Sequence, residues 1–310
     1  MSVVLASSVC DSPEVLRSTR TVTDRPAAGA EMASRRSPHH QPHNFSPRMI
    51  AVTSGKGGVG KSNISVNLAS LLSRSGVKVA LIDADWGQGN LDVLLGVSAK
   101  RSVSEVISGE RSLWGVMLGL PHSLHLAAGS SGPIHSAGSP MQAMLDGGLM
   151  DVCRDHDMTI LDCGSGIGSD VMDVCLLCGH VLVVTTPEPT AMTDAYGLIK
   201  CLHRDGHKGR ISVLVNMAGS AQEAKATFFR LSRVAAKFLG QTLFDAGYVL
   251  ADEKVPLAVR KRQPFVQAYP SCDASNCLAA LMMKLRTKGC KPSEKDPWHK
   301  RLARVLRKVT

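Results

Sequence analysis

A glycine-rich loop with two lysines occupies residues 55–62, where the sequence reads Gly-Lys-Gly-Gly-Val-Gly-Lys-Ser. An apolar run precedes the loop and a helical pattern follows it, so the loop joins a strand to a helix. Glycines in that setting let backbone N–H groups surround phosphate oxygens. Lys61 then reaches the β- and γ-phosphates of a nucleotide, and the Ser62 hydroxyl ligates Mg²⁺. The predicted nucleotide-binding residues of the loop are Gly55, Lys56, Gly57, Gly58, Val59, Gly60, Lys61, Ser62 and Asn63.

Aspartates accompany two further apolar segments that the sequence predicts as strands. The segment 78–83 ends in Asp83, with Asp85 two residues on, and the segment 157–161 is followed by Asp162. Carboxylates at the C-terminal edge of parallel strands lie beside the phosphate loop of a doubly wound sheet. We expect Asp83 and Asp162 near the Mg²⁺ ion, and Asp85 in position to orient the attacking water. Ordinary turn aspartates are the alternative.

The early lysine of the loop, Lys56, makes it resemble the deviant Walker A loop of the MinD/ParA ATPases. In that family the early lysine reaches across a dimer interface to the partner's nucleotide. The resemblance therefore implies a homodimer that forms with ATP, and a catalytic role for Lys56 beside Lys61 and Asp85. A solvated loop lysine is the alternative that the sequence leaves open.

Three other segments, 90–96, 183–196 and 214–217, resemble the flagellar-number regulators called FlhG or FleN more than MinD or ParA. The likeness covers about residues 48–287. It implies a Mg²⁺-dependent ATPase that regulates flagellar number or placement, with an FlhF-type GTPase and flagellar basal-body or regulator proteins as partners. It also implies that Asn216 recognises adenine and that the region of Asp252 closes over the base and ribose. A partition or division-site ATPase of the ParA or MinD kind is the alternative.

The chain has 310 residues, with 36 basic and 26 acidic side chains. Residues 1–50 hold six basic and four acidic ones and residues 284–310 hold ten and two, which leaves twenty of each between them. Residues 49–287 read as one run of alternating strand and helix patterns, which predicts a doubly wound, mainly parallel sheet with helices on both faces. The expected strands are 49–53, 78–83, 123–128, 157–161, 180–186, 210–216 and about 242–249. Because this domain is neutral overall, we expect no specific nucleic acid partner.

The positive charge gathers in the last residues, after a polar linker at 288–296. Residues 297–310 predict a helix with an apolar arc of about 100° and basic residues opposite, as in helices that lie in the membrane interface. The arc consists of Trp298, Leu302, Val305, Leu306 and Val309. MinD and FlhG carry such a helix, so we expect an otherwise cytoplasmic protein to bind an anionic membrane surface in its ATP state. A tail packed on its own domain and a disordered nucleic-acid-binding end are the alternatives.

Residues 1–48 are rich in Ser, Pro, Arg and His and predict a disordered extension. Within it, residues 11–17 have the spacing of the FlhG segment that activates the GTPase, with Asp11, Leu16 and Arg17 in the matching positions. Ser12 replaces the family's glutamine, so a plain disordered segment is an equal alternative.

Nine cysteines, an odd number, favour a reducing compartment over a disulfide framework. Cys175 and Cys178 form a C-x-x-C pair, and some relatives of these ATPases carry iron–sulfur clusters between subunits. An iron–sulfur carrier ATPase is therefore a further alternative. The pair lies in an apolar stretch, which favours core packing.

Overall fold

The computed structural model describes residues 48–130 and 138–287. The predicted extension, linker and C-terminal helix lie outside these residues. So do the individual predictions for Asp11, Leu16, Arg17, Trp298, Leu302, Val305, Leu306 and Val309.

The described residues form one eight-stranded sheet in the order β3-β4-β2-β5-β1-β6-β7-β8. All neighbouring strands are parallel except β3 and β4, which are antiparallel. The strands are β1 (Met49–Ser54), β2 (Val79–Ala84), β3 (Leu118–Leu120), β4 (Leu124–Ala127), β5 (Met158–Ser165), β6 (His180–Thr185), β7 (Arg210–Ala218) and β8 (Phe244–Leu250). The prediction of a doubly wound, mainly parallel sheet is confirmed.

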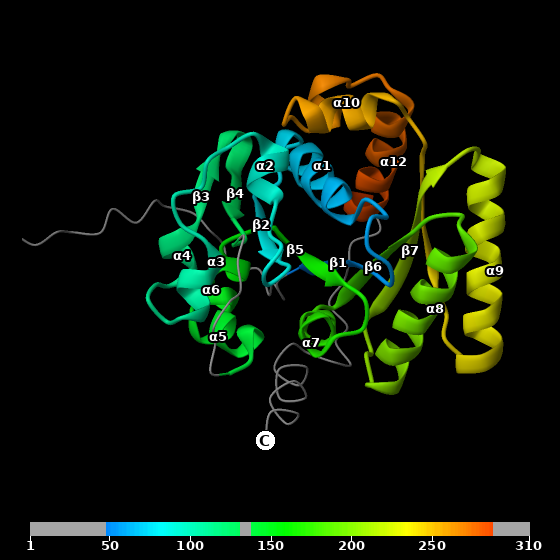
Figure 1. Cartoon of the computed structure of the whole chain (residues 1–310), viewed down its shortest axis with the longest axis horizontal. Coiled ribbons are helices and arrows are strands. Elements are labelled where there is room, and N and C mark those ends of the chain that lie inside the picture. Colours follow the sequence, from blue (N-terminus) through cyan, green and yellow to red (C-terminus); the bar gives the residue numbers. More distant parts are fainter. Residues whose placement is uncertain (1–47, 131–137, 288–310) are drawn as a thin grey trace, which may run out of the picture. The chain divides into compact units, whose positions relative to one another are not determined.

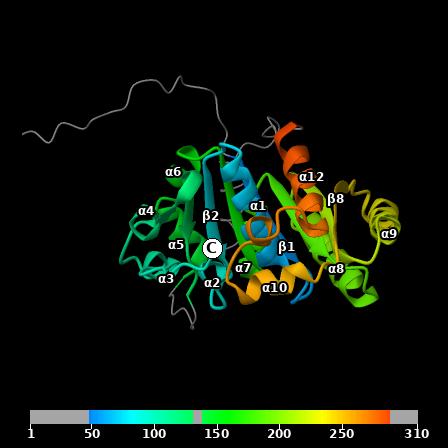
Figure 2. The same cartoon turned by 90° about the horizontal axis from the view of Figure 1, so that it is seen from above.

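Helices cover both faces of the sheet. The principal ones are α1 (Lys61–Arg74), α7 (Ser169–Leu177), α8 (Pro189–Arg204), α9 (Ala221–Leu239) and α12 (Asp273–Thr287). The shorter ones are α2 (Leu91–Leu95), α3 (Val103–Ile107), α4 (Leu113–Val116), α5 (Pro140–Asp146), α6 (Leu149–Arg154), α10 (Lys254–Arg260), α11 (Phe265–Ala268) and the 3₁₀ turn η1 (Pro121–Ser123). Figures 1 and 2 show α1 and α12 side by side on one face, and α7 and α8 on the other.

Two hydrophobic layers result from this arrangement, one on each side of the sheet. Ile50 and Val52 of β1 belong to the layer that contains α1 and α12, whereas Met49 and Ala51 belong to the layer that contains α7 and α8. Since both sides of the central strands are buried, their sequences are continuously apolar instead of alternating. Among the residues that the structure describes, no helix is both long and apolar enough to cross a membrane.

The structure adds one strand to those predicted and extends two others beyond their predicted ends. The short edge strand β3, with the sequence Leu-Gly-Leu, was not expected because three residues show no period. The strand predicted at 157–161 runs on to Ser165, and the strand predicted at 210–216 runs on to Ala218. Both are interior strands, and pairing with one neighbour extends each beyond its apolar run: β5 pairs with β1 as far as Ser165, and β7 pairs with β8 as far as Ala218. Asp162 therefore lies within β5 and not after it, and Asn216 lies within β7, two residues before its end.

Candidate nucleotide-binding site

Glycine is required at Gly55 and Gly60 of the phosphate loop for different reasons. A Cβ on Gly55 would lie 2.1 Å from the backbone carbon of Asp194 in α8, so only glycine lets the loop pass there. Gly60 has a φ of 87°, and a Cβ there would lie 2.4 Å from the Asn216 side-chain nitrogen. The loop is thus held between α8 and the end of β7 by contacts that no other residue type allows.

Helix α1 begins directly after the loop without a side-chain cap. Its N-cap is Gly60, no acidic residue occupies its first turn, and Lys61 at its first position is 9% exposed. Uncapped N–H groups and the positive end of the helix dipole both favour a negative charge at this point. The helix start is therefore suited to a phosphate group.

Two of the predicted aspartates face each other on neighbouring strands beside this helix start. Asp83 of β2 and Asp162 of β5 are register partners, and each is 1% exposed. The Asp83 carboxylate accepts backbone hydrogen bonds from Asp85 and Asn90, both at 3.1 Å. The Asp162 carboxylate accepts a 2.7 Å hydrogen bond from the Ser65 hydroxyl, one turn along α1. The structure thus brings both acids and α1 together.

Burial makes the ionised form of both acids unfavourable in the absence of a cation. Burial, together with the nearby Asp162 carboxylate, raises the pKa of Asp83 from 3.8 to about 7. Burial also raises the pKa of Asp162, although the Lys61 ammonium and hydrogen bonds from Ser62 and Ser65 act in the opposite direction. A pair of buried carboxyl groups of this kind has the oxygen donors that a divalent cation prefers.

Asp85 lies immediately after β2 and is half-buried. Its carboxylate would be 3.5 Å from a Cβ on Gly164, and its charge acts on Asp162 to raise the pKa of that residue. Asp85 therefore borders the space between the loop and the two buried acids. This is the region that its predicted role requires, and the role itself stays a prediction.

Lys56 is engaged within its own chain. Its ammonium donates to the Glu188 carboxylate at 2.8 Å and to the Thr190 hydroxyl at 3.1 Å. Both partners lie at the start of α8, and the Lys56 and Glu188 side chains are 40% and 63% exposed. An exposed ion pair of this kind contributes little to stability, so the lysine can leave it at small cost.

Asn216 and Asp252 both make structural contacts. Asn216 donates from its side-chain nitrogen to the Val59 carbonyl at 2.8 Å and so supports the phosphate loop from β7. Asp252 accepts hydrogen bonds from the backbone N–H groups of Lys254 and Ala274, at 2.8 and 3.1 Å. Although burial acts to raise the pKa of Asp252, these hydrogen bonds hold it below its usual value. Its carboxylate ties the start of α10 to α12, and contact with a base or ribose stays a prediction.

Four contributors to the site were missed from the sequence. Ser65 could have been found, because it lies three residues after Ser62 on the same face of α1. Glu188 was only weakly indicated by the sequence, where it is a charged residue between two prolines after a strand. Gly89 and Gly129 gave none, although a Cβ on either would meet the backbone of the other and approach the Asp83 carboxylate within 3.0 Å.

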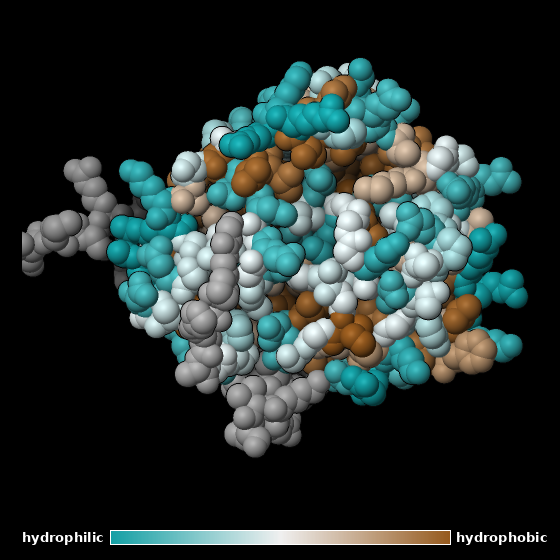
Figure 3. Space-filling view, viewed as in Figure 1, coloured by the Kyte–Doolittle hydropathy of each residue, from teal (hydrophilic) through white to brown (hydrophobic). Residues whose placement is uncertain are grey.

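Large apolar side chains are exposed next to the loop. Met217 is 47% exposed, and its methyl carbon would lie 3.4 Å from a Cβ on Gly60. Ile167 is 58% exposed and follows Gly166, whose N–H donates to the Ser54 carbonyl. On the face seen in Figure 3, hydrophobic residues occur in separate patches among polar ones.

Cys175 and Cys178 are fully buried in the layer beneath α7, as the core-packing interpretation predicted. A side-chain hydrogen bond with Cys163, together with burial, raises the pKa of the Cys175 thiol well above its usual value. A neutral thiol inside the core is a poor metal ligand.

Comparison with known proteins gives a consistent result. A sequence model of the ParA group, described as an NUBPL iron-transfer P-loop NTPase, matches residues 46–285. The antiactivator FleN of Pseudomonas aeruginosa is 41% identical over 77% of this chain and 86% of its own length. The flagellum site-determining protein YlxH of Helicobacter pylori is 38% identical over 61% of this chain and 64% of its own length. Among solved structures, the septum site-determining protein MinD of Pyrococcus horikoshii, complexed with Mg-ADP, superposes with a TM-score of 0.66 at 20% identity, over 80% of this chain and 99% of its own.

Proposed function

Because the chain belongs to the ParA/MinD family of P-loop NTPases and has the fold of MinD, we propose that it is a Mg²⁺-dependent ATPase switch. We propose further that this switch regulates flagellar number or placement. Members of the family are ATPases. The flagellar role is supported by the names of two relatives, an antiactivator FleN and a flagellum site-determining protein. The switch consists of a soluble monomer and an ATP-bound dimer on the membrane.

The observation that carries the ATPase proposal is the cluster of charged side chains around one loop. Lys61 lies at the uncapped start of α1, and the buried pair Asp83 and Asp162 faces it from two adjacent strands. A glycine loop alone would support phosphate binding. The acids add the second requirement of phosphoryl transfer, which is a place for the metal that accompanies the nucleotide.

The residues present fit a Mg²⁺ ion. Ser62, Asp83 and Asp162 offer only oxygen donors, and their shared burial leaves the two carboxylates in need of a positive charge. Mg²⁺ held there would neutralise charge that develops on the phosphates. Lys61 binds the β- and γ-phosphates from the other side, and the loop N–H groups hold the phosphate oxygens.

Asp85 orients the attacking water in this proposal. It is the half-buried acid of the cluster, close to Gly164, so its carboxylate remains accessible to solvent. Phosphoryl-transfer catalysis consists mainly of positioning and electrostatic stabilisation, and a carboxylate that orients the water supplies the positioning.

Dimerisation with ATP is supported by two features at the edge of the loop. Met217 and Ile167 expose apolar surface that a second subunit would cover. To reach the partner's nucleotide, Lys56 must break its contacts with Glu188 and Thr190. The cost is small because the ion pair with Glu188 is exposed. The early lysine is therefore held back in the monomer and becomes catalytic in the dimer.

Membrane association follows from the dimer in this proposal. Residues 297–310 form one weak amphipathic anchor per subunit, and two anchors on one dimer bind far more tightly than one. The protein is then cytoplasmic as a monomer and peripheral on the membrane with ATP. Its partners are an FlhF-type GTPase, activated by residues 11–17, and flagellar basal-body or regulator proteins.

The decisive experiment separates ATP binding from hydrolysis with Asp85→Ala. This variant should bind Mg-ATP with unchanged affinity but lose most turnover, and it should run as a long-lived dimer on gel filtration with ATP. Asp146→Ala, an exposed acid on α5, is the control and should behave as the wild type. Normal turnover in Asp85→Ala would remove this residue from catalysis.

The flagellar role needs a test in the source organism. Deleting the gene should change the number or position of flagella, as counted by electron microscopy, and the wild-type gene should restore them. The Asp85→Ala gene should not restore the wild-type pattern, because its product cannot return to the monomer. Normal flagella in the deletion strain would contradict the flagellar role and leave the ATPase proposal intact.

The iron-transfer alternative has weaker support, although the matching sequence model carries that description. A cluster shared between subunits needs thiolates at a surface. Cys175 and Cys178 are both fully buried, so they could reach such a cluster only after α7 unpacks.

A further inference from the structure

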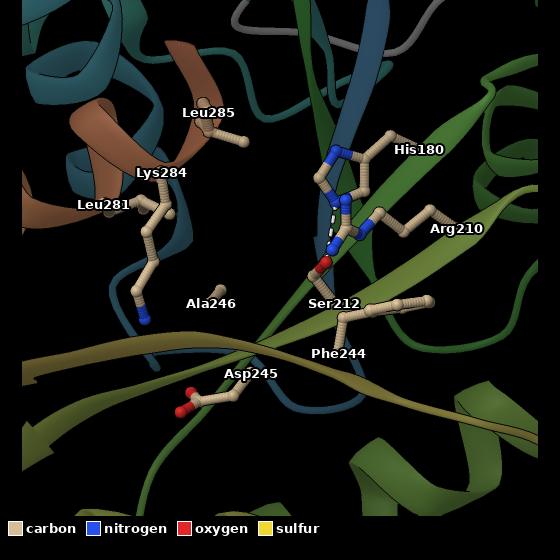
Figure 4. Close-up of a pocket in the computed structure, with 9 residues that line it drawn as sticks. All are labelled: His180, Arg210, Ser212, Phe244, Asp245, Ala246, Leu281, Lys284 and Leu285. Atoms are coloured by element: carbon tan, nitrogen blue, oxygen red, sulfur yellow. Dashed lines mark hydrogen bonds between the residues drawn. The ribbon is translucent and has the colours of Figure 1, made fainter. Parts of the chain in front are cut away.

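A cavity of about 300 Å³ lies at the amino-terminal ends of the parallel strands β6, β7 and β8. The phosphate loop follows the carboxyl-terminal end of β1, so the two sites lie at opposite ends of the strands. Its walls include the first residue of each strand: His180, Arg210 and Phe244. Lys284, in the last turns of α12, projects toward it from the other side (Figure 4). Nothing in the proposed ATPase chemistry uses these residues.

Arg210 is held in one orientation, and one of its donor atoms lacks an acceptor among the described residues. Its guanidinium carbon lies 4.0 Å from the centre of the Phe244 ring, which fixes the plane of the group. Its Nε atom is buried and has no hydrogen-bond partner among the residues that the structure describes. Within the same residues, no carboxylate forms an ion pair with it. A buried donor without an acceptor costs free energy that a bound anion would recover.

The charge around the cavity is positive. Arg210 and Lys284 each contribute one positive charge, and Asp245 is the acidic residue in the lining. The Asp245 carboxylate already accepts a 2.7 Å hydrogen bond from the Gly247 N–H, and Figure 4 shows it pointing away from Arg210. Two cations thus face a cavity whose acid is engaged elsewhere.

The remaining polar groups are neutral. The His180 imidazole and the Ser212 hydroxyl share a 2.8 Å hydrogen bond on the cavity wall (Figure 4). Burial, with the positive charge of Arg210 nearby, lowers the pKa of His180 to about 3. The histidine is therefore uncharged at neutral pH, and the Ser212 hydroxyl offers a further polar contact.

We propose that this cavity binds a phosphate group, either as the free anion or as the phosphate monoester of a lipid headgroup, between Arg210 and Lys284. A guanidinium fork matches two phosphate oxygens, and the Lys284 ammonium and Ser212 hydroxyl approach from other directions. Donors from several sides suit a tetrahedral anion better than a planar carboxylate. The cavity volume of about 300 Å³ is ample for a phosphate group and leaves room for the substituent of a monoester.

The position of Lys284 in the chain gives a physical reason why the bound phosphate could belong to a lipid. Lys284 lies four residues before the predicted linker at 288–296, which leads into the predicted membrane helix. A phosphate bound beside α12 would therefore act near the start of the tail. The inference is independent of the ATPase proposal, because the cavity and the phosphate loop lie at opposite ends of the strands.

Calorimetric titration of the full chain with inorganic phosphate tests the site. The protein is first saturated with Mg-ADP, so that the phosphate loop is filled. The wild type should bind one phosphate, and Arg210→Gln should weaken binding at least about tenfold, since a charge-assisted hydrogen bond is lost. Lys284→Gln should weaken it less. Lys237→Gln on α9, an exposed lysine outside the cavity, is the matched control and should bind as the wild type.

Arg210→Lys serves as a second variant if Arg210→Gln does not fold. It keeps the charge but loses the fork and the stacking on Phe244, so it should also bind phosphate more weakly than the wild type. ATP turnover should be unchanged in every variant of the cavity. Absence of phosphate binding by the wild type, or equal binding by the wild type and all cavity variants, would overturn the proposal.

Vesicles distinguish the two sources of phosphate. Flotation with phosphatidic acid in phosphatidylcholine should fall in Arg210→Gln, relative to Lys237→Gln, if the ligand is a lipid headgroup. If the ligand is the free anion, flotation should be equal in the two variants while the calorimetric difference remains. Either result supports the phosphate site and assigns its source.

Discussion

At the scale of single residues, the phosphate loop and its acids are a set of opposed charges in a buried setting. Lys61 is 9% exposed, and Asp83 and Asp162 are each 1% exposed. Burial of this kind strengthens every electrostatic interaction in the site, and it also makes the loss of one charge costly. Two predictions concern these charges.

Lys61→Ala should weaken ATP binding at least about tenfold, because the fixed charge that faces the β- and γ-phosphates is lost. ATP-dependent dimerisation should be lost with it. Isothermal titration and gel filtration measure the two effects. Lys200→Ala, an exposed lysine on α8, is the control and should bind ATP normally. Unchanged affinity and turnover in Lys61→Ala would contradict the assignment of the loop.

Asp83 predicts a dependence of stability on pH in the metal-free protein. Burial raises the pKa of this carboxyl group from its ordinary 3.8 to about 7 in the fold, so between these values the folded state holds a proton that the unfolded state has lost. Stability from this group is therefore complete at low pH and declines as pH rises through that window. Each pKa unit corresponds to about 1.4 kcal/mol.

Urea unfolding in chelator at several pH values measures this effect. Asp83→Asn cannot ionise, so its free energy of unfolding should fall less than that of the wild type between the two pKa values. Asp146→Asn, which changes an exposed acid, should keep the wild-type slope. If the free energy of unfolding depended on pH in the same way in the wild type and in Asp83→Asn, the pKa of Asp83 would not be raised by folding. Added Mg²⁺ should stabilise the wild type more as pH rises, because the ionised form binds the metal.

At the scale of elements, the phosphate loop depends on α8 as much as on its own sequence. The backbone of Asp194 and Ala195 fills the space beside Gly55, and Glu188 and Thr190 at the start of the same helix hold Lys56. One helix therefore controls both the path of the loop and the position of its early lysine. A shift of α8 would alter both together.

Gly55→Ala should destabilise the fold by about 1–3 kcal/mol, because its Cβ would collide with the α8 backbone. Gly197→Ala is the matched control on the same helix. A Cβ there meets nothing within 4 Å, so this change should be neutral or should stabilise the helix by about 0.5–1 kcal/mol. Chemical denaturation compares the two. Equal stability of the two variants would mean that the loop can move away from α8 without cost.

At the scale of the whole molecule, the nucleotide site and the predicted membrane anchor are far apart in the sequence. The loop occupies residues 55–62 and the anchor residues 297–310. A dimer couples them without a conformational signal, because ATP brings two subunits together and doubles the number of anchors. In this proposal, membrane binding depends on burial of the apolar arc of the predicted helix.

Leu306→Glu puts a charge within that arc and should release the protein from anionic liposomes. Basal ATP turnover in solution should be intact. Ala303→Glu adds the same charge outside the arc and is the matched control, expected to reduce binding only slightly. ATP-dependent flotation measures both. Equal flotation of Leu306→Glu and the wild type would show that this helix is not the membrane contact.

The sequence by itself determined the features that depend on local order along the chain. Apolar runs located seven of the eight strands, and the loop residues with Asp83, Asp85 and Asp162 followed from a motif and from strand ends. The strand predictions succeed because a parallel strand that is buried on both faces must be apolar. The loop prediction is specific because a phosphate loop needs glycines at fixed spacing, and the roles of its residues stay predictions. The edge strand β3 was missed, since three residues carry no period.

Only the tertiary structure decided which distant groups meet. The register of β2 against β5 puts Asp83 opposite Asp162, and that proximity, with burial, raises the pKa of Asp83. Likewise, Lys56 meets Glu188 across 132 positions of sequence, and the cavity at Arg210 forms from three strand starts and one helix end. Pairing and burial are properties of the folded chain, because strand order and register bring together residues that no local pattern connects.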